Sequence, residues 1–183
     1  MHIPFAVPKS WSWCRLRHIG NVIGGGTPKT AIDDYWDGDV PWITPADLSG
    51  YNEMYISGGA RNISVLGLSK SSAQLMPAGT VLFSSRAPIG YVAIANNVIS
   101  TNQGFKSFVP ATNEITSDYM YYCLKAMCGS IAARASGTTF KEISGTEMAE
   151  TLVPLPPVNE QKKIVECIKS FYTCINNIEA SLN

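Results

Sequence analysis

The chain ends in PLPPVNEQKKIVECIKSFYTCINNIEASLN, from Pro154 to Asn183, and this stretch organises the rest of the sequence. After Pro157 it contains neither proline nor glycine. Six large apolar residues recur at spacings of four, three, four, three and four: Ile164, Ile168, Phe171, Ile175, Ile178 and Leu182. This is the a/d rhythm of a helix that packs one stripe against another helix. We expect a helix from Glu160 to Asn183, about 36 Å long, with its start fixed by the prolines.

The predicted helix leaves open what covers its apolar stripe. It can fold back onto the preceding residues, or it can reach away from them to a partner helix, and periodicity alone favours neither. A chain of 183 residues has room for one domain and an appendage. We therefore divide the sequence into a domain over residues 1–153 and a proline hinge with its helix over residues 154–183.

Composition is that of an ordinary globular protein. Apolar residues make up 45% and charged residues 15%, and the formal net charge of zero does not indicate a nucleic-acid partner. The charges are unevenly placed, however. Residues 1–29 hold four bases and no acid, residues 30–60 six acids and no base, and residues 61–106 four bases and no acid. These segments can fold into a basic face or neutralise one another, and the sequence does not decide between the two.

The five cysteines are odd in number and form no C-x-x-C pair. We expect buried or half-exposed free thiols. With only His2 and His18 to join them, no zinc site is expected. The N-terminus lacks the apolar region of a signal peptide, and no apolar run approaches about eighteen residues. The expected location is the cytoplasm.

Residues 1–110 have the pattern of short strands separated by turn signals. The expected extended segments are residues 11–16, 40–44, 55–56, 61–64, 74–76, 80–85, 90–95 and 105–109. Segments 74–76 and 80–85 are expected to form a hairpin or corner. About one helical turn is expected between Leu16 and Ile23, and a turn at residues 35–39. A further helical turn is expected at Pro45–Leu48, with Thr44 as its cap.

The pattern becomes helical after residue 110. A four-three-four spacing of apolar residues predicts one helix through Met120, Leu124, Met127 and Ile131. Thr116 or Ser117 can cap this helix. A capping box that begins at Ser144 predicts a short helix ending near Glu150. The predicted fold class is α+β: a β-rich domain with a few helices, followed by a long C-terminal helix of the coiled-coil type.

The sequence shows no set of residues that could act together in catalysis. His18 is the only interior histidine, and Ser84 lacks the G-x-S-x-G context of a nucleophile elbow. The glycine run at residues 24–26 lacks the Gly-Lys-Ser/Thr ending of a phosphate loop. No glycine-rich strand–turn–helix for a dinucleotide or methyl-donor cofactor is evident. We expect a binding module and not an enzyme, with no cofactor and no metal.

Polar residues gather at loops that strands bracket. The loops span residues 27–30, 84–86, 101–103 and 136–141. They supply amide, hydroxyl and cationic donors, the groups that contact phosphates and base edges in nucleic-acid recognition. On composition alone, the turn chemistry of strand ends is the better explanation for each of them.

Several short words follow one another in a specific order. They are GGTP (25–28), YW (35–36), VPWITPADL (40–48), SSRAPIG (84–90), TNQGFK (101–106), GTTF (137–140) and PLPP (154–157) followed by EQ (160–161). Each word is weak alone, but the ordered set resembles the DNA-specificity (S) subunit of type I restriction-modification systems. The resemblance covers nearly the whole chain, as one target-recognition domain and the helix after it.

The resemblance implies a division of labour. In the family, two target-recognition domains each read one half of a bipartite site in double-stranded DNA. Two long helices pack antiparallel between them and dock the modification (methyltransferase) subunits, which carry S-adenosylmethionine. Restriction subunits join through these partners. The resemblance thus implies a non-catalytic subunit that needs no cofactor of its own.

The chain departs from the family in size, because it holds one recognition domain where the usual subunit holds two. It can be a half-subunit that pairs with a copy of itself, in which case two-fold symmetry predicts an inverted-repeat site. It can also be part of a longer chain. A rival interpretation is an interaction protein that pairs with specificity or modification subunits and regulates assembly without reading sequence.

Candidate DNA contacts follow from donor chemistry in the loops. They are Lys29, Thr30, Arg61, Lys70, Arg86, Asn102, Gln103, Lys106 and Lys141. The candidate helix-partner interface is the apolar stripe defined above, from Ile164 to Leu182.

Overall fold

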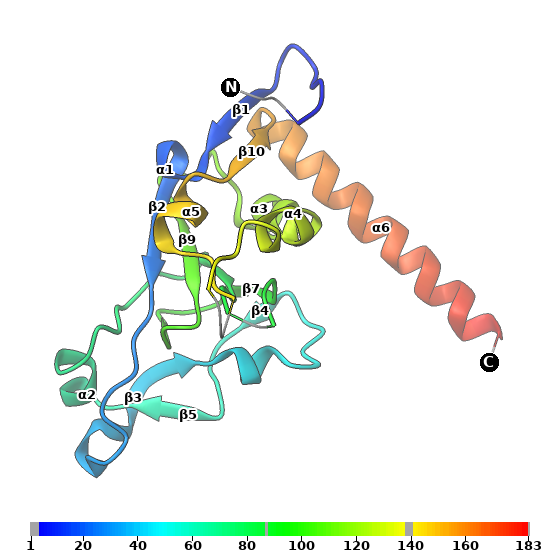
Figure 1. Ribbon diagram of the computed structural model, residues 1–183. Coiled ribbons are helices and arrows are strands. Elements are labelled where there is room, and N and C mark those ends of the chain that lie inside the picture. The colour runs from blue at the N-terminus through cyan, green and yellow to red at the C-terminus, as the bar shows by residue number, and fades with distance from the viewer. Residues whose placement is uncertain (1–3, 87, 138–140, 183) are drawn as a thin grey trace.

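The computed structural model describes residues 4–86, 88–137 and 141–182 and shows an α+β body from which one long helix departs (Figure 1). The strands are β1 (Ser12–Arg15), β2 (Gly20–Gly24), β3 (Trp36–Ile43), β4 (Tyr55–Ile56), β5 (Arg61–Ile63), β6 (Val81–Phe83), β7 (Val92–Ala95), β8 (Ser100–Thr101), β9 (Lys106–Pro110) and β10 (Leu152–Leu155). The helices are α1 (Leu16–Ile19), α2 (Val65–Ser69), α3 (Ser117–Ala126), α4 (Cys128–Ala132), α5 (Gly145–Ala149) and α6 (Val158–Leu182), with 3-10 turns η1 (Asp33–Tyr35) and η2 (Pro45–Leu48). The predicted fold class is confirmed.

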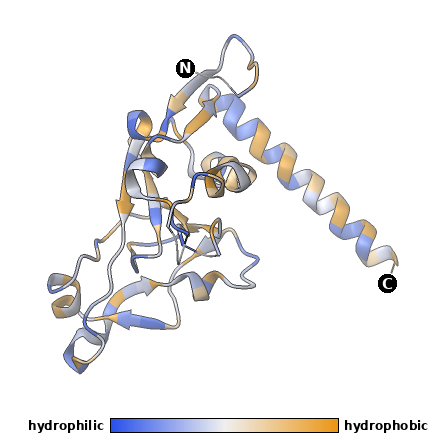
Figure 2. Ribbon diagram, viewed as in Figure 1, coloured by the Kyte–Doolittle hydropathy of each residue, from blue (hydrophilic) through white to orange (hydrophobic). Residues whose placement is uncertain are grey.

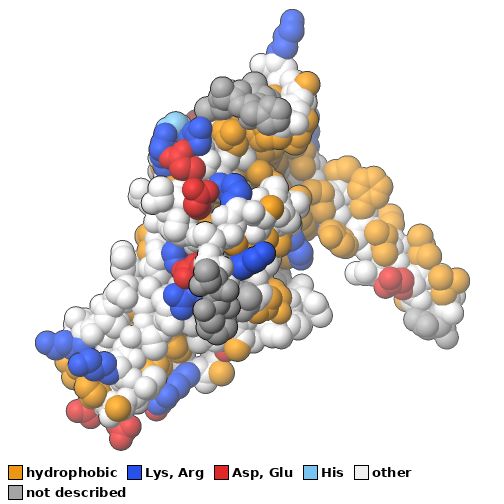
Figure 3. All heavy atoms as spheres, viewed as in Figure 1, with side chains coloured by type: hydrophobic (Ala, Val, Ile, Leu, Met, Phe, Trp, Pro, Cys, Tyr) orange, Lys and Arg blue, Asp and Glu red, His pale blue; other side chains and the backbone are white. Residues whose placement is uncertain are grey.

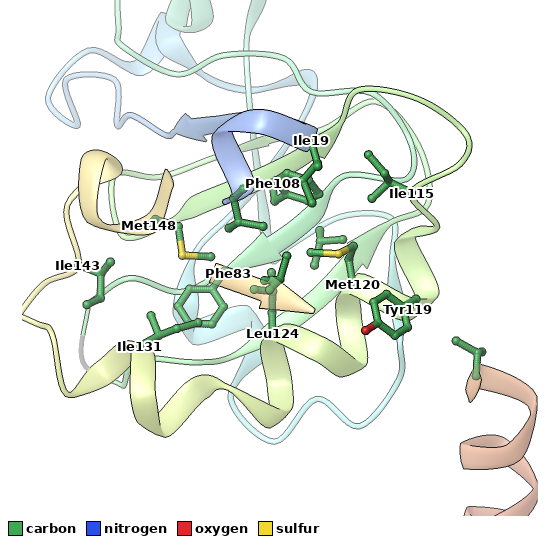
Figure 4. Close-up of a cluster of buried hydrophobic side chains, with 14 residues drawn as sticks. Ile19, Phe83, Phe108, Ile115, Tyr119, Met120, Leu124, Ile131, Ile143 and Met148 are labelled. Atoms are coloured by element: carbon green, nitrogen blue, oxygen red, sulfur yellow. The ribbon is translucent and has the colours of Figure 1, made fainter. Parts of the chain in front are cut away.

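A five-stranded sheet in the order β2-β9-β6-β7-β4 forms the centre of the body. Its neighbouring strands run antiparallel, apart from the parallel pair β4 and β7. Alternation along β6 sends Val81 and Phe83 to one face and Leu82 to the other. On the first face Phe83 packs in one cluster with Met120 and Leu124 of α3 (Figure 4). Burying each such side chain contributes roughly 1.5–3 kcal/mol.

A smaller sheet in the order β5-β3-β8 forms the lower lobe in Figure 1. Its core holds Trp36 and Trp42, whose rings lie edge to face with their centroids 5.2 Å apart. The Trp42 indole Nε1 donates to the carbonyl of Gly26 at 2.9 Å. This bond ties the glycine run after β2 to the small sheet, so the lobe and the main sheet share one connecting loop.

The pair β1–β10 brings the N-terminal segment beside the start of α6, with Trp13 opposite Pro154. Tyr119 of α3 donates its hydroxyl to the Pro154 carbonyl at 2.5 Å. This short ladder fixes the point from which α6 leaves the body.

Gln161 anchors the first turn of α6. Its side chain is 1% exposed, and its Oε1 accepts from the backbone N–H of Thr116 at 2.9 Å. Its Nε2 donates to the carbonyls of Glu114 and Pro156, both at 2.9 Å. Because every polar atom of this buried amide is satisfied, the helix leaves the body in a defined direction.

Several predicted elements are confirmed. The long helix begins at Val158, two residues before the predicted start, and runs to Leu182; Asn183 lies outside the described residues. Thr44 and Asp47 form a capping box at η2, and the Ser144 hydroxyl accepts from the Glu147 N–H at the start of α5.

Other predictions were wrong. The helix predicted through Met127 and Ile131 is two helices, α3 and α4, that meet at Met127. Residues 74–76 form no hairpin strand; Met76 makes an isolated bridge with Ile99. Residues 36–39, predicted as a turn, belong to β3. The helical turn after Leu16 ends at Ile19, since Val22 and Ile23 belong to β2.

Candidate nucleic-acid interface

Two of the predicted polar loops meet beside the main sheet. The Thr27 hydroxyl is hydrogen-bonded to the side-chain oxygen of Gln103, and the Gly26 N–H donates to the Thr101 carbonyl at 2.9 Å. A Cβ on Gly25 would lie 2.0 Å from the Asn102 carbonyl oxygen. The glycine run therefore permits close approach of two backbones.

An ion-paired triad adjoins these loops. The Arg86 Nε donates to Glu142 Oε2 at 2.8 Å, and the Lys106 Nζ donates to Glu142 Oε1 at 3.0 Å. The Lys106 Nζ also lies 3.3 Å from the Gln103 carbonyl, which it donates to. Partial burial raises the pKa of Glu142, but the hydrogen bonds from Arg86 and Lys106 outweigh it and hold that pKa below its ordinary value.

Two members of the triad, Lys106 and Glu142, line a groove of about 430 Å³ together with Ser136, Gly137, Ser144 and Gly145. Two cations against one carboxylate leave a formal charge of +1. Three of the candidate contacts, Arg86, Gln103 and Lys106, are thus brought together at one place. Lys141 is exposed and precedes Glu142, while residues 138–140 lie outside the described part.

A second group of candidates lies on the lower lobe. The Arg61 guanidinium stands over the Trp36 ring at 4.2 Å and donates to both Asp37 carboxylate oxygens at 3.0 and 3.2 Å. These hydrogen bonds lower the pKa of Asp37. Lys29 and Lys70 are exposed and make no ion pair with any described residue. Figure 3 shows Lys and Arg side chains gathered on this lobe.

Two further candidate DNA contacts, Asn102 and Thr30, lie in different surroundings. The Asn102 side-chain oxygen accepts from the Gly104 N–H at 2.9 Å, which holds a turn. Thr30 is exposed beside Lys29 on the lower lobe. Of the two outcomes left open by the charge pattern, neutralisation between a basic and the acidic segment is seen for Arg61 and Asp37. Lys29 and Lys70 make no ion pair with any residue that the structure describes.

Sequence reasoning missed the acids of these sites. Glu142 lies 56 residues from Arg86 in the chain, and Asp37 lies 24 residues from Arg61. No local sequence pattern predicts ion pairs between residues so far apart in the chain. A comparable triad, in which Glu150 binds Arg15 and Arg17, lies at α1 and was also not predicted.

The apolar stripe of α6 is uncovered over its distal half. Ile164 and Ile168 are half-buried, whereas Phe171, Ile175, Ile178 and Leu182 are exposed by 66%, 49%, 58% and 80%. Figure 2 shows hydrophobic and hydrophilic bands alternating along the projecting helix. The sequence left open whether the helix folds back onto the preceding residues or reaches away from them. In the structure, the helix reaches away from its own domain.

The cysteines are free, and the expectation of their burial holds for three of them. Cys14, Cys123 and Cys128 are half-buried, and burial raises the pKa of the Cys123 thiol to about 12. The prediction was wrong for Cys167 and Cys174, which are exposed because α6 stands clear of the body. Within the described residues, no three His, Cys, Asp or Glu side chains are grouped to hold a metal, and no helix has the length and apolarity of a membrane span.

The fold is similar to that of two solved structures. The chain superposes with a TM-score of 0.78 and 22% identity on a chain from the structure titled "Structural basis underlying complex assembly and conformational transition of the type I R-M system". It superposes on the HsdS subunit from Thermoanaerobacter tengcongensis with a TM-score of 0.75 and 19% identity. Each match covers 99% of this chain, and 43% and 42% of the respective other chain.

Residues 8–183 match the family described as "Type I restriction modification DNA specificity domain", and the chain belongs to this family. It is 43% identical to the type I restriction enzyme MjaIX specificity subunit of Methanocaldococcus jannaschii, over 93% of this chain and 40% of that subunit. It is 29% identical to the EcoR124I/EcoR124II specificity subunit of Escherichia coli, over 93% of this chain and 43% of that subunit. The chain thus spans about two fifths of these relatives.

Proposed function

We propose that this chain recognises a DNA sequence for a type I restriction-modification complex and reads one half of a bipartite target. Residues 1–153 would form the DNA-reading head, and residues 154–183 a hinge and spacer helix. The observation that carries the proposal is the family match over residues 8–183, on a head whose loops gather Arg86, Gln103 and Lys106. In this role the chain is a non-catalytic cytoplasmic subunit.

Both groups of donors can contact phosphates, and the first also offers an amide for a base edge. Arg86 and Lys106 supply cations for phosphates, and the exposed Gln103 amide can contact a base edge. On the lower lobe, Lys29 and Lys70 are cations without a counter-ion among the described residues and suit phosphate contact. Thr30, Arg61, Asn102 and Lys141 stay candidate contacts at the edges of these groups.

The stripe of α6 supports antiparallel pairing of two helices. Its spacings are symmetric about Thr173, so an antiparallel partner with the same sequence pairs Ile164 with Leu182, Ile168 with Ile178 and Phe171 with Ile175. Every apolar residue of the stripe then meets another. We propose that the partner is a second copy, or the equivalent helix of a second half. Modification subunits would dock on this helix pair, and restriction subunits through them.

Selection of bound duplexes from a random DNA pool by the purified chain tests the proposal. We expect enrichment of one motif, and a two-fold symmetric motif if two copies pair. The control is Phe171→Glu, which places a charge in the stripe and should leave a single half-site. Recovery of no motif at any salt concentration would contradict DNA reading by this chain.

The interaction-protein alternative is favoured by one observation, the exposed stripe from Phe171 to Leu182. It predicts self-association or capture of specificity subunits by the wild-type chain without enrichment of any DNA motif. The same pair of proteins in the same selection therefore separates the two functions.

A further inference from the structure

Asp118, in the first turn of α3, joins three elements of the molecule. Its Oδ2 accepts from the Lys169 Nζ of α6 at 2.8 Å, and its Oδ1 accepts from the hydroxyl of Tyr55 in β4. The Tyr55 carbonyl in turn accepts from the Tyr51 hydroxyl at 2.5 Å. We call Tyr55, Asp118 and Lys169 the Asp118 cluster. It connects the long helix to an edge strand of the main sheet through one carboxylate.

Both donors of the Asp118 cluster keep their protons at neutral pH. Burial, and then the hydrogen bond to Asp118, raise the pKa of Tyr55 to about 12. The hydrogen bond to Asp118 also raises the pKa of Lys169. The side chains of Lys169 and Asp118 are 50% and 27% exposed, so water screens their ion pair. The cluster therefore contributes little to stability, and what it offers is a fixed geometry.

The helix α6 is buried against the body in its first turns. The buried residues in its described part are Gln161 and Val165, and Lys169 follows at the same spacing of four. The three residues thus share one face of the helix. This face meets the start of α3, where Gln161 accepts from the Thr116 N–H and Lys169 donates to Asp118. Lys169 adds a second polar contact about 12 Å further along the helix axis.

Beyond Lys169 a hollow of about 580 Å³ lies between α6 and the body. Tyr121 and Tyr122 of α3 line one side of it, and Tyr172 and Asn176 of α6 line the other. Figure 1 shows α6 standing away from the body toward its C-terminal end. The hollow leaves room for the helix to swing toward or away from α3. The Asp118 cluster lies at the edge of this hollow, where it opposes such a swing.

A small movement at the Asp118 cluster becomes a large movement of the head. A displacement of about 2 Å at Lys169, about 12 Å from Gln161, is a rotation of about 10°. A domain of about 150 residues is roughly 38 Å across, so its far end moves by about 6 Å relative to the helix. One base step of duplex DNA is about 3.4 Å. The angle between head and helix thus changes the position of the DNA-reading loops by about two base steps.

We infer that Asp118 is a positioning residue that fixes the angle between head and helix, and through it the number of base pairs between two DNA half-sites. The inference rests on the proposed DNA reading and helix pairing. It adds that the spacing depends on a contact inside each chain, and not on the helix pair alone. The residue acts through Lys169 and Tyr55 and touches no DNA itself.

Pulsed electron paramagnetic resonance measures the angle in the single chain. One spin label at Ala133→Cys, an exposed residue of the body, and one at Ser181→Cys, near the end of α6, report the distance between them. Phe171→Glu is added to keep the chain monomeric, and serine replaces the exposed Cys167 and Cys174. The same chain without the two label sites measures background labelling of the half-buried thiols. We expect one narrow distance distribution.

Two variants break the Asp118 cluster. Lys169→Gln removes the cation, and Asp118→Asn places an amide N–H₂ that cannot accept from Lys169. An exposed ion pair shifts an equilibrium about two- to fivefold. We therefore expect distances displaced by several Å to become about two- to fivefold more populated. In about 1 M salt the unmodified cluster should approach the Lys169→Gln distribution, because the Debye length falls to about 3 Å.

Two further variants are controls. Lys169→Arg keeps a cation for Asp118 and should restore the narrow distribution. Lys163→Gln removes the same charge from another exposed lysine of α6, one that makes no ion pair with any described residue. It should leave the distance distribution unchanged.

The spacing of half-sites is the readout that a contact serving stability alone would not change. It is measured by selection of duplexes from a random pool, with the stripe of α6 intact. We expect one spacing for wild type, Lys163→Gln and Lys169→Arg. Lys169→Gln and Asp118→Asn should enrich the same half-sites at two or more spacings.

The outcomes separate the angle from the proposed function. Unchanged distance distributions in Lys169→Gln and Asp118→Asn overturn the inference, whatever the selection yields. Changed distances with one unchanged spacing also overturn it, because the angle then has no effect on the DNA site. A wild type that enriches no motif, or only one half-site, contradicts the proposed reading or pairing, and the claim about spacing is then wrong as well. In that case the distance measurement still decides whether Asp118 holds the helix.

Discussion

Replacing Glu142 with glutamine tests whether DNA lies against the triad of Arg86, Glu142 and Lys106. The amide keeps the shape of the carboxylate but removes its charge. The formal charge of the triad rises from +1 to +2, since two cations lose their one acid. The fold should persist, because partly exposed ion pairs contribute about 0–1 kcal/mol each.

The charge change sets the expected size of the effect. One more net positive charge at the interface releases about one more counter-ion, which steepens the plot of log K against log salt by about 0.9. Near 0.1 M salt this corresponds to about eightfold tighter binding of duplex DNA, roughly 1.2 kcal/mol. Most of this gain is independent of base sequence, so discrimination between target and random duplex should fall or stay level.

Fluorescence anisotropy of a labelled duplex, titrated at salt from about 50 to 200 mM, measures affinity and slope together. The control is Glu150→Gln, which makes the same chemical change in a carboxylate that also binds two cations, Arg15 and Arg17. That triad lies at α1, outside the candidate loops. An unchanged slope for Glu142→Gln, or an equal rise for Glu150→Gln, would refute the placement of DNA at the Glu142 triad.

Four further expectations follow from the structure. Arg86→Ala should weaken DNA binding and reduce the salt slope by about 0.9; if both stay the same in anisotropy, Arg86 is structural. Phe171→Glu should abolish dimers in sedimentation and leave the monomer folded, since the Phe171 side chain is 66% exposed; a persisting dimer would exclude pairing through the stripe. Leu124→Ala, fully buried in the main core, should cost roughly 2–5 kcal/mol in urea unfolding, and a cost near zero would contradict the core assignment. The lowered pKa of Glu142 means that its carboxylate stabilises the fold at neutral pH and loses this effect as pH falls through the lowered pKa. The stability difference between wild type and Glu142→Gln, measured by urea unfolding, should therefore shrink on acidification, and a constant difference would argue against the ion pairs.

The sequence predicts elements whose cause is local. The helix α6 follows from six spaced apolar residues and from the absence of proline and glycine after Pro157. The turn η2 follows from Thr44, Pro45 and Asp47, a capping box with proline at its first position. In each case the residues that decide the structure lie within a few positions of one another.

Elements that depend on tertiary contacts were not predicted from the sequence. The helix α2 reads Val65-Leu66-Gly67-Leu68-Ser69, which has β-branched and glycine residues and little helical propensity. It forms because Ser64 caps it and because Gly67 fits tightly against Tyr35, where a Cβ would lie 2.2 Å from the carbonyl oxygen. Similarly, β8 is two residues long and is defined by its parallel partner β3.

The candidate site was predictable in its donors and not in its arrangement. Polar loops at strand ends identified Arg86, Gln103 and Lys106, which the fold brings together. The carboxylate that joins two of them comes from Glu142, far away in the chain, and only the packed structure reveals it. The exposure of the helical stripe was likewise undecided in the sequence, because periodicity shows that a face is apolar and not what covers it.

We propose above that this chain gives a restriction-modification complex its DNA sequence preference. A genome-wide map of methylated adenines tests this proposal. The map compares cells that carry the gene and its modification subunits with cells from which only this gene is removed. We expect one bipartite motif to lose its methylation when the gene is removed, and this motif to have two-fold symmetry if two copies pair. An unchanged set of methylated motifs would contradict the claim.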